Sequence, residues 1–379
     1  MSSFSVKNEI VQLYTELTPR MGGIYIAVNE FKKALGGKTL DVSRSRSEAD
    51  LTVSPKAMIK YNFAIWYGSL ARKQLDEISS SCRGYILHGV FDETARIVWR
   101  AYQSSSKVPY ALVPHGLLDP WVFTYRSLRK KIWLALLGRQ LLKHAQVVIC
   151  ASEGELMKLQ KRFPDANYTV CHWGIADHFF PNTKSINRAQ LNSRFNLPSD
   201  KKILLMIGRI SRVKQFVKVA KIFSESDLVE KAHLLIVGIP EELEEGLLLD
   251  EAIKSSGNSI TLIPPQFDED KHVIFGGVDL FVNLSQKENF SYTTAESLSF
   301  DVPVIISSEV DIHPILASFG CAQVLSVDAS PDDLKSAVNA LILNPGHPRK
   351  AYLECFTQKM FSDNLKNIID TYLPSRFHE

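Results

Sequence analysis

The sequence lacks the cysteine patterns that mark disulfide frameworks and structural zinc sites. Its 379 residues include five cysteines, which are widely spaced and never form C-x-x-C. Disulfide-rich domains and zinc sites need paired or closely spaced cysteines. No charged N-terminal region runs into an apolar stretch, and no run approaches 18 uncharged apolar residues. We therefore expect a cytoplasmic protein without disulfides, a signal peptide or a membrane span.

Two nucleotide-binding fingerprints are also missing. No G-x-G-x-x-G follows a predicted strand, which disfavours dinucleotide oxidoreductases, and no G-x-x-x-x-G-K-[ST] is present, which disfavours P-loop kinases. The net charge is small, because 44 Lys and Arg residues nearly balance 41 Asp and Glu residues and leave a formal net charge of +3. This balance gives no reason to expect a nucleic-acid partner.

What the sequence has is an alternation of short apolar runs with helical patterns. This alternation is typical of parallel sheets with crossover helices. The chain is longer than a single core usually supports, so two domains are expected. The predicted strands are 85–88, 110–113, 147–150 and 168–171, then 203–207, 234–238, 260–263, 280–282 and 302–306. The fold class is therefore α/β, with two doubly wound domains.

A polar, turn-rich stretch at 180–202 separates the two sets of strands. It has the composition of an interdomain connection. We expect an N-terminal domain at 1–190, a C-terminal domain at 191–360, and a last helix at 361–379 that can pack back on the first domain.

The loop after strand 203–207 carries two cations. Gly208 allows the backbone to approach a ligand, and Arg209 and Lys214 follow at the mouth of a strand-to-helix turn. Arginine suits a diphosphate through forked hydrogen bonds, and lysine suits it as a point charge. The alternative is a solvated basic loop.

A second polar segment opens a predicted helix further along the chain. Its N-terminus near Phe290, Ser291 and Tyr292 presents free N–H groups and a partial positive charge, which together form an anion site. Glu288 precedes this helix and Glu296 lies within it, so both carboxylates could face one ligand. In the alternative interpretation both are surface carboxylates.

These segments resemble glycosyltransferase family 4, the retaining, nucleotide-sugar-dependent enzymes of GT-B fold. The family carries G-R-L-x-x-x-K-G, E-x-F-G-x-x-x-x-E and A-x-G-x-P-V-I. The matching residues are Gly208, Arg209, Lys214, Glu288, Phe290, Glu296 and 303–305. The stretch 113–121, V-P-H-G-L-L-D-P-W, is similar to P-H-G-M-L-D-P-W of members that build bacterial surface polysaccharides. Residues 86–89 and 152–155 stand where such proteins carry H-G and T-x-x-E.

The resemblance implies two Rossmann-like domains facing each other across a cleft, with a donor site in the second. Gly208, Arg209 and Lys214 would hold the donor diphosphate, assisted by the N–H groups of residues 290–292. Glu296 would accept hydrogen bonds from the ribose hydroxyls. Cations and helix N–H groups fit this role, because negative charge develops on the diphosphate as the sugar leaves.

The resemblance also implies residues around the transferred sugar. Glu288 would contact that sugar, and His115 would lie near the sugar and the departing phosphate. Gly22, Gly23 and His88 would lie on the sugar or acceptor side. His115 and Glu288 are therefore the candidate catalytic residues.

Five positions depart from the family pattern. Gln215, Ser291 and Asp301 stand where the family has glycine, and Leu284 replaces a common proline. Aspartate tolerates left-handed backbone better than most residues, so the turn at 301 can survive. Trp173 begins W-G-I-A where N-G-[IV]-D is usual, and no role is assigned to it.

No metal and no cofactor are expected. The acidic turn Asp268–Asp270 matches the D-x-D that binds metal in a different glycosyltransferase fold, but here it precedes a predicted helix. We favour a helix-capping role, because aspartate is preferred at such ends.

The stretch 120–152 has no acidic residue. Its six cations between 126 and 143 alternate with leucine, isoleucine and tryptophan, which predicts a basic amphipathic helix. One interpretation places it on an anionic membrane, next to a lipid-linked acceptor. The favoured alternative for its apolar face is burial against the N-terminal sheet.

The leading prediction is a metal-independent hexosyltransferase in surface polysaccharide biosynthesis. Its partners would be a nucleotide-diphosphate sugar and a glycan or lipid-linked saccharide, with no nucleic acid. It would be cytoplasmic, and peripheral on the inner face of the membrane if the basic helix docks there. A nucleotide-sugar epimerase of the same fold and a catalytically silent sugar-nucleotide-binding subunit remain as alternatives. A phosphorylase is disfavoured, because no pyridoxal-phosphate lysine motif is visible.

Overall fold

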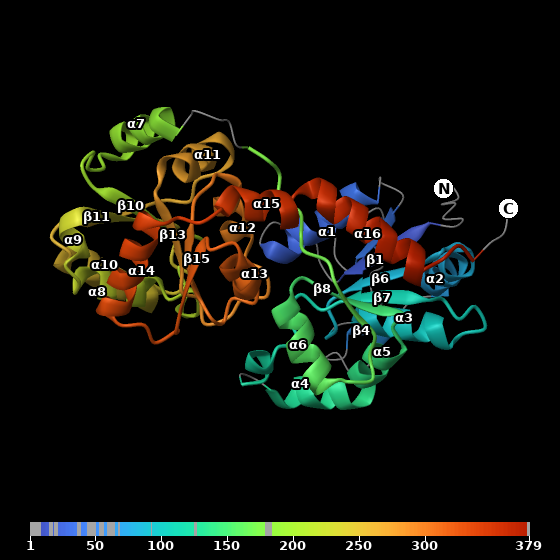
Figure 1. Cartoon of the computed structure of the whole chain (residues 1–379). Coiled ribbons are helices and arrows are strands. Elements are labelled where there is room, and N and C mark those ends of the chain that lie inside the picture. The colour runs from blue at the N-terminus through green and yellow to red at the C-terminus, as the bar shows by residue number, and fades with distance from the viewer. Residues whose placement is uncertain are drawn as a thin grey trace. The chain divides into compact units, whose positions relative to one another are not determined.

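The computed structural model describes residues 9–14, 18, 22–35, 39–43, 51–52, 57–58, 65–66, 69–91, 93–124, 127–178 and 184–376. The chain forms two compact units (Figure 1). The first is Met1–Gly174 with Gln358–Glu379, and the second is Ile175–Thr357. Each unit is built around one parallel sheet, so the predicted α/β class with two parallel-sheet domains is confirmed.

The first unit contains a sheet with the strand order β3-β2-β1-β6-β7-β8-β9. Its strands are β1 (Ile10–Tyr14), β2 (Thr39–Ser43), β3 (Leu51–Thr52), β6 (Gly84–His88), β7 (Tyr110–Val113), β8 (Val147–Cys150) and β9 (Tyr168–Val170). A separate antiparallel pair is β4 (Ala57–Met58) with β5 (Ile65–Trp66). Every residue of β6, β7 and β8 is buried, as expected for parallel strands covered on both faces.

Helices cover both faces of this sheet (Figure 1). They are α1 (Gly23–Ala34), α2 (Ser69–Ser81), α3 (Glu93–Gln103), α4 (Ser127–Trp133), α5 (Arg139–His144), α6 (Glu153–Arg162) and α16 (Gln358–Tyr372). In Figure 1, α1 and α16 lie on one side of the sheet, and α3 and α5 lie on the other. Helix α1 begins directly after Gly22, its N-cap residue.

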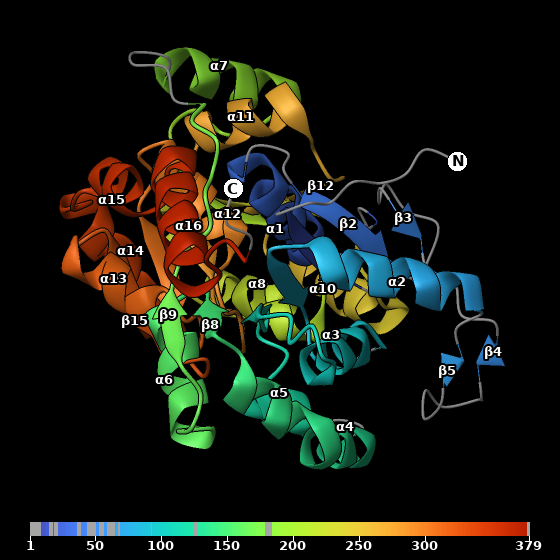
Figure 2. The same cartoon turned by 90° about the vertical axis from the view of Figure 1, so that its right-hand side faces the viewer.

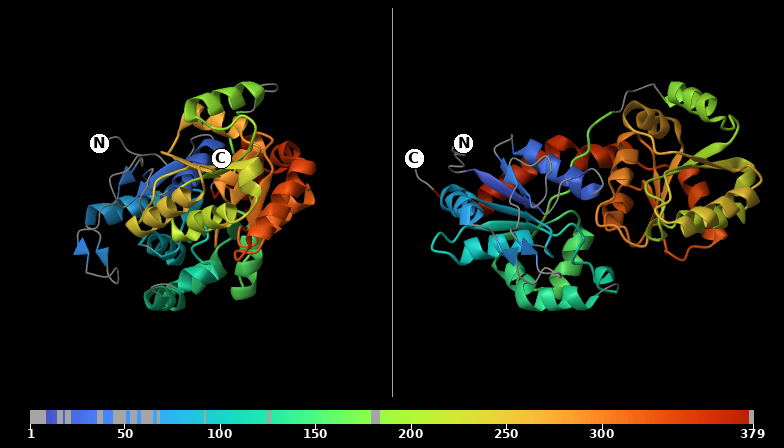
Figure 3. Two further views of the ribbon diagram at one scale, coloured as in Figure 1. Left: turned by 90° about the vertical axis from the view of Figure 1, so that its left-hand side faces the viewer. Right: turned by 180° about the vertical axis from the view of Figure 1, so that it is seen from behind.

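The second unit contains a sheet with the order β12-β11-β10-β13-β14-β15. Its strands are β10 (Lys202–Ile207), β11 (Ala232–Val237), β12 (Ile260–Ile263), β13 (Leu280–Asn283), β14 (Val304–Ser307) and β15 (Ala322–Leu325). Its helices are α7 (Lys184–Phe195), α8 (Phe216–Ser224), α9 (Leu228–Lys231), α10 (Leu243–Ser255), α11 (Asp268–Gly277), α12 (Tyr292–Ser299), α13 (His313–Ser318), α14 (Pro331–Leu343) and α15 (Pro348–Cys355). Figure 3 shows them on both faces of the sheet. All five strands predicted in this half are present.

The boundaries between the units differ from those expected. The chain changes unit after Gly174 and after Thr357, whereas the sequence suggested 190 and 360. The polar stretch at 180–202 contains helix α7, which packs on α11. Arg188 of α7 donates to a carboxylate oxygen of Asp279 at 2.7 Å and to the Gly277 carbonyl at 2.8 Å. These contacts make α7 part of the second unit, which a turn-rich composition does not reveal.

The last helix, α16, is an integral part of the first unit. It lies beside α1 (Figure 2), and Phe31 and Phe361 have ring centroids 5.3 Å apart. Arg83 donates to the Ile369 carbonyl at 3.2 Å and to the Asp370 carboxylate at 2.7 Å. Arg376, just beyond the helix, donates to the Ser106 carbonyl at 2.6 Å. The two arginines therefore fasten the C-terminal end of the chain to loops near the start of β6 and β7.

The basic stretch of the sequence forms one helical segment with a π-helical turn, Leu134–Gly138, between α4 and α5. Leu134, Leu141 and Leu142 are buried in the core of the first unit. Leu128 and Leu136 are exposed, at 70% and 71%. The expectation that the apolar face packs on the sheet is therefore correct for only part of the segment. Among the helices of the described residues, none is both long and apolar enough to cross a membrane.

The acidic turn 268–270 lies in the first turn of α11. Phe267 occupies the N-cap position, so the carboxylates follow the cap rather than form it. Asp270 accepts hydrogen bonds from Arg194 of α7, with one N···O distance of 2.9 Å. The predicted capping role is therefore wrong for these carboxylates, and Asp270 instead joins α7 to α11.

Candidate functional site

The predicted donor residues gather at the strand switch of the second sheet. From β10 the sheet grows in one direction through β11 and β12, and in the other through β13 to β15. Ligands of open α/β sheets bind at such a switch, beyond the carboxyl ends of the strands. Gly208 and Arg209 follow β10 directly, and Lys214 ends a short 3₁₀ turn at residues 212–214. Glu288 lies between β13 and α12.

Lys214 and Glu288 form an ion pair inside this site. The ammonium group of Lys214 donates to Oε1 of Glu288, and the Ser285 hydroxyl donates to the same oxygen at 2.9 Å. The backbone of Glu288 bridges to Val310, and its carbonyl accepts from the Asp311 amide at 2.8 Å. Burial alone would raise the pKa of Glu288, but the charge and hydrogen bond of Lys214 outweigh it and lower this pKa below its usual value. Glu288 is therefore an ionised, positioned carboxylate.

Two further ion pairs flank this one. Arg209, which is largely exposed, donates to a carboxylate oxygen of Glu241 in the loop after β11. Lys271 of α11 lies 2.7 Å from both carboxylate oxygens of Glu296 in α12. Sequence analysis does not single out Glu241 or Lys271, because their role depends on which segments the fold brings together. Each proposed donor-binding charge thus has an internal partner of opposite sign.

The predicted anion site at residues 290–292 is the N-terminus of α12. The helix begins at Tyr292, with Ser291 as its N-cap residue. The Phe290 side chain is buried against Tyr292 and Phe356, at centroid distances of 5.2 and 5.8 Å. Its aromatic ring is therefore a core group. The donors that this helix end can offer a ligand are its first-turn N–H groups, which lack the i−4 carbonyl partner of later residues. The Thr294 N–H already donates to the Ser291 carbonyl at 3.1 Å.

The three positions that lack the family's glycine all adopt left-handed backbone. Their φ angles are 56° at Gln215, 67° at Ser291 and 60° at Asp301. Side-chain contacts support two of these turns. The Ser291 hydroxyl accepts from the Asn283 amide at 2.9 Å, and the Asp301 carboxylate accepts from the Arg349 N–H at 3.1 Å. The turns therefore survive these substitutions, each at a conformational cost that glycine avoids.

In the first unit, His88 and His115 form a hydrogen-bonded pair. His88 Nδ1 lies 2.9 Å from His115 Nε2, and His88 Nε2 lies 2.8 Å from Oε1 of Gln12. His88 ends β6 and His115 follows β7, so the residues stand at the carboxyl ends of neighbouring strands. Burial lowers the pKa of His115 to about 3. Burial and the proximity of His115 lower that of His88 well below its usual value. Both imidazoles are neutral at physiological pH.

The loop that carries His115 is clamped by Glu155. One carboxylate oxygen of Glu155 accepts from the Gly116 N–H at 2.7 Å, and the other accepts from the Ala151 N–H at 2.8 Å. His115 itself has a φ of 53°. Trp173, which received no role from the sequence, is buried with its ring centroid 6.0 Å from that of His115. Glu155 thus holds the backbone next to His115, and the indole of Trp173 packs near the imidazole.

Gly22 and Gly23 mark the start of α1. Gly22 is its N-cap residue, with a φ of 58°, and Gly23 is its first helical residue. A left-handed φ at the N-cap explains why glycine occupies position 22. No interaction in the described structure joins these glycines to the histidine pair, so their predicted sugar or acceptor role stays a prediction.

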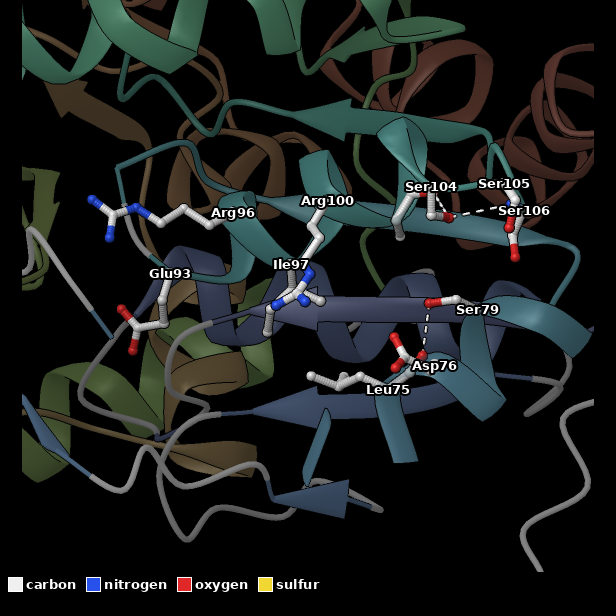
Figure 4. A pocket seen from close by; sticks show the side chains of 11 residues that line it. Leu75, Asp76, Ser79, Glu93, Arg96, Ile97, Arg100, Ser104, Ser105 and Ser106 are labelled. Carbon is white, nitrogen blue, oxygen red and sulfur yellow. Dashed lines mark hydrogen bonds between the residues drawn. The ribbon is translucent and has the colours of Figure 1, made fainter. Parts of the chain in front are cut away.

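A separate hollow lies between α2 and α3 of the first unit (Figure 4). Its volume is about 310 Å³, and none of the predicted site residues lines it. Arg96 and Arg100 face it together with the carboxylates of Asp76 and Glu93. Because these charges balance, the hollow has no preference for an anion or a cation, and it is not the predicted site.

Comparison with known proteins finds a family match within the second unit. Residues 187–354 match the family described as Glycosyl transferases group 1. The curated D-inositol 3-phosphate glycosyltransferase of Nocardiopsis dassonvillei is 26% identical over 220 residues, which are 54% of this chain and 50% of that protein. The chain thus spans about half the length of this curated relative.

Solved structures resemble the chain over nearly its whole length. Sucrose-phosphate synthase of Thermosynechococcus elongatus has a TM-score of 0.73 at 16% identity, covering 96% of this chain and 99% of its own. Anabaena HepE, in complex with UDP and glucose, has a TM-score of 0.73 at 13% identity, covering 96% and 100%. These likenesses establish the GT-B type of fold. The family match alone points to a glycosyl transferases group 1 domain, at residues 187–354 of the second unit.

Proposed function

We propose that the chain is a retaining glycosyltransferase that moves a hexosyl group from a nucleotide-diphosphate sugar to a glycan or lipid-linked saccharide. The observation that carries the proposal is the meeting of Lys214, ionised Glu288 and the N-terminus of α12 at one strand switch. The group 1 domain match and the UDP and glucose complex of HepE support a nucleotide-sugar donor. The likeness of residues 113–121 to a segment of polysaccharide-building enzymes supports a role in surface polysaccharide synthesis.

The chemistry needs positive charge where the diphosphate leaves. Breaking the bond between the sugar C1 and the phosphate oxygen places negative charge on that oxygen, and preorganised cations stabilise it. Lys214 and Arg209 supply the cations, and the first-turn N–H groups of α12 supply further donors. No metal and no cofactor are needed in this scheme. To reach the diphosphate, Arg209 must exchange Glu241 for a phosphate oxygen, and Lys214 must share its charge between Glu288 and the ligand.

Retention is proposed to follow front-face transfer. The acceptor oxygen attacks C1 on the face that the diphosphate leaves, and its proton passes to the departing phosphate oxygen. Glu288 stabilises positive charge that develops on the sugar ring, and Glu296 holds the ribose. In a double displacement, Glu288 would instead bond to C1. Near wild-type turnover in Glu288→Gln would contradict both roles of this carboxylate.

Thermal-shift measurements with UDP, GDP, ADP and their sugars identify the donor. A ligand at 100 times its Kd raises the free energy of unfolding of the protein by about 2.7 kcal/mol. With the stabilising nucleotide sugar, Arg209→Ala and Lys214→Ala are each expected to lose a charge-assisted contact of about 1.5–3 kcal/mol. That corresponds to a fall in kcat/KM of about 10- to 150-fold. Lys335→Ala, which breaks an exposed ion pair with Asp227, is the matched control.

The outcomes separate the candidate functions. Transfer to a saccharide with retained configuration supports the proposal. Interconversion of two nucleotide sugars without an acceptor would indicate an epimerase, and tight binding without turnover would indicate a silent subunit. Unchanged kcat/KM in both cation variants would refute the diphosphate assignment. Activity that EDTA abolishes and manganese restores would refute metal independence.

We also propose that the chain is cytoplasmic and docks on anionic membranes through α4 and the following π turn. Leu128, Ile132 and Leu136 recur every four residues and are exposed at 70%, 39% and 71%, so they form one stripe. Exposed Arg129, Lys131, Arg139 and Lys143 accompany this stripe. An exposed apolar stripe with flanking cations suits the interface of an anionic bilayer, where each cation contributes about 1 kcal/mol.

Vesicle co-sedimentation tests this docking. Binding to phosphatidylglycerol vesicles at low salt is expected to exceed binding to phosphatidylcholine vesicles, and Leu128→Gln with Leu136→Gln is expected to weaken it. Leu343→Gln on α14, which is 88% exposed, serves as the control. Equal binding to both kinds of vesicle would remove the membrane claim.

A further inference from the structure

Three side chains form a hydrogen-bonded line across the first sheet, and we call them the imidazole relay: Gln12, His88 and His115. Gln12 is the central residue of β1 and is completely buried. His88 is the last residue of the adjacent β6, and His115 follows the next strand, β7. The contacts are 2.8 Å from Gln12 to His88 and 2.9 Å from His88 to His115. A buried glutamine amid apolar strand residues costs stability unless its amide is bonded, so the relay accounts for its presence.

The chemistry of the three groups fixes the direction of both hydrogen bonds. The amide oxygen of Gln12 only accepts, so Nε2 of His88 must carry the proton. A neutral imidazole has a single N–H, which leaves the lone pair of His88 on Nδ1. That lone pair accepts from Nε2–H of His115. The lone pair of His115 is therefore on Nδ1, which has no hydrogen-bond partner among the described residues.

We propose that Gln12 and His88 are positioning residues that hold His115 as its Nε2–H tautomer, with Nδ1 as a fixed hydrogen-bond acceptor for a hydroxyl group of the substrate. This inference rests on the proposed function, because it names what His115 recognises. A ring nitrogen with a lone pair accepts from a sugar hydroxyl and repels a phosphate oxygen, which is itself only an acceptor. His115 thus selects a hydroxyl-bearing group over a phosphate.

The surroundings of the relay support this assignment. Burial lowers the pKa of both histidines, so neither ring gains a second proton. A second proton on His88 would reverse the direction of its hydrogen bond with His115. The Glu155 clamp holds the backbone of Gly116 and so keeps the His115 ring in register with His88. The rings of His88 and His115 are nearly parallel, at 20°, with centroids 5.2 Å apart. The relay is therefore rigid at both of its hydrogen bonds.

Nitrogen NMR of the full chain, with ¹⁵N in the histidine rings, tests the tautomer directly, since protonated and unprotonated ring nitrogens have distinct shifts. Signals are assigned with His88→Asn and His115→Asn. In the wild type we expect a lone pair on Nδ1 of His115, unchanged between pH 8 and pH 5. Gln12→Leu removes the acceptor and should give a mixture of tautomers. Gln12→Glu favours a charged His88, which then donates through both nitrogens and reverses His115. A proton on Nδ1 of wild-type His115, or identical spectra in all variants, would overturn the proposal.

Kinetics distinguishes positioning from general destabilisation. With the nucleotide sugar identified by the screen, Gln12→Leu should lower kcat/KM about 5- to 10-fold, the loss of roughly one hydrogen bond. Its affinity for the free nucleoside diphosphate should stay within about twofold, because the Nδ1 lone pair of His115 cannot donate a hydrogen bond to a phosphate oxygen. Ser79→Ala removes another buried, hydrogen-bonded side chain of this unit and should change neither quantity. Equal losses for sugar and diphosphate would assign Gln12 a structural role. If no nucleotide sugar is turned over, the proposed function is wrong. The NMR measurement still decides, independently of turnover, which nitrogen of His115 carries the proton.

Discussion

Replacing Lys214 with methionine is expected to destabilise the second unit by about 3 kcal/mol at neutral pH. Removing one member of a buried ion pair costs about 3–5 kcal/mol, because the remaining charge stays in a poorly solvated place. The Lys214 and Glu288 side chains are 25% and 13% exposed, so the lower end of that range applies. Methionine keeps the length of the apolar stem, which limits the change to the lost charge. Ser285 remains as a hydrogen-bond donor to the stranded carboxylate.

The pH dependence follows from the same pair. In the wild type the pKa of Glu288 is lowered, so its stabilising contribution is present above the usual glutamate pKa and is lost as pH falls through the lowered value. In Lys214→Met the burial of Glu288 is no longer opposed by a cation, so its pKa rises above the usual value. The carboxylate then takes up a proton in mild acid, and the neutral group no longer carries the free-energy cost of an unpaired buried charge. The difference in free energy of unfolding between wild type and variant should therefore be smaller at pH 5 than at pH 8.

A double-mutant cycle provides the assay. Urea unfolding is followed by circular dichroism for wild type, Lys214→Met, Glu288→Gln and the double variant. All five tryptophans lie in the first unit, so their fluorescence reports on that unit separately. The double variant should recover about 2 kcal/mol relative to Lys214→Met, because the uncharged amide needs no cation. Lys335→Met, in an exposed pair, should leave stability unchanged. A double variant no more stable than Lys214→Met would refute the reasoning. So would a loss of unfolding free energy in Lys214→Met that is the same at pH 5 and pH 8.

Three further outcomes are expected. Glu241→Gln frees Arg209 from an exposed ion pair worth about 0.2–1 kcal/mol, so nucleoside diphosphate should bind up to about 5-fold tighter by calorimetric titration; weaker binding would contradict the role of Arg209. Asp301→Gly should be about 1 kcal/mol more stable than Asp301→Ala in thermal unfolding, because alanine must keep the left-handed φ of 60° without the bond to Arg349. Arg83→Ala should speed hydrogen exchange in α16 while leaving α12 unchanged, since the Arg83 side chain donates to Ile369 and Asp370 of α16.

The sequence predicts most strands because parallel strands buried on both faces are continuous apolar runs, as in β7 and β10. It does not reveal β1, because Gln12 interrupts the apolar run at its centre. The same residue belongs to the imidazole relay, so the position that hides the strand is one for which we propose a function. A polar residue inside a strand becomes informative only when its partner on the neighbouring strand is known.

The residues of the candidate site were chosen from motif spacing, and their roles stay predictions. The ion pair between Lys214 and Glu288 was not predicted from the motifs. Glu241 lies in a loop and Lys271 in α11, and only the fold brings them beside Arg209 and Glu296. The unit boundary at 174 was missed because the polar residues of α7 resemble a linker, while the contacts that make it a helix of the second unit lie on α11.

The placement of α16 has a consequence for the order in which the chain folds during synthesis. The second unit is one continuous segment, whereas the first unit needs a helix that follows Thr357. At about 5–20 residues per second, roughly 10 to 40 s separate the emergence of Gly174 from that of α16. During that interval the surface that α16 covers, through buried Phe361, Leu365 and Ile369, has no cover from its own chain. The second unit can therefore complete its core first, and the first unit becomes whole only when α16 has left the ribosome.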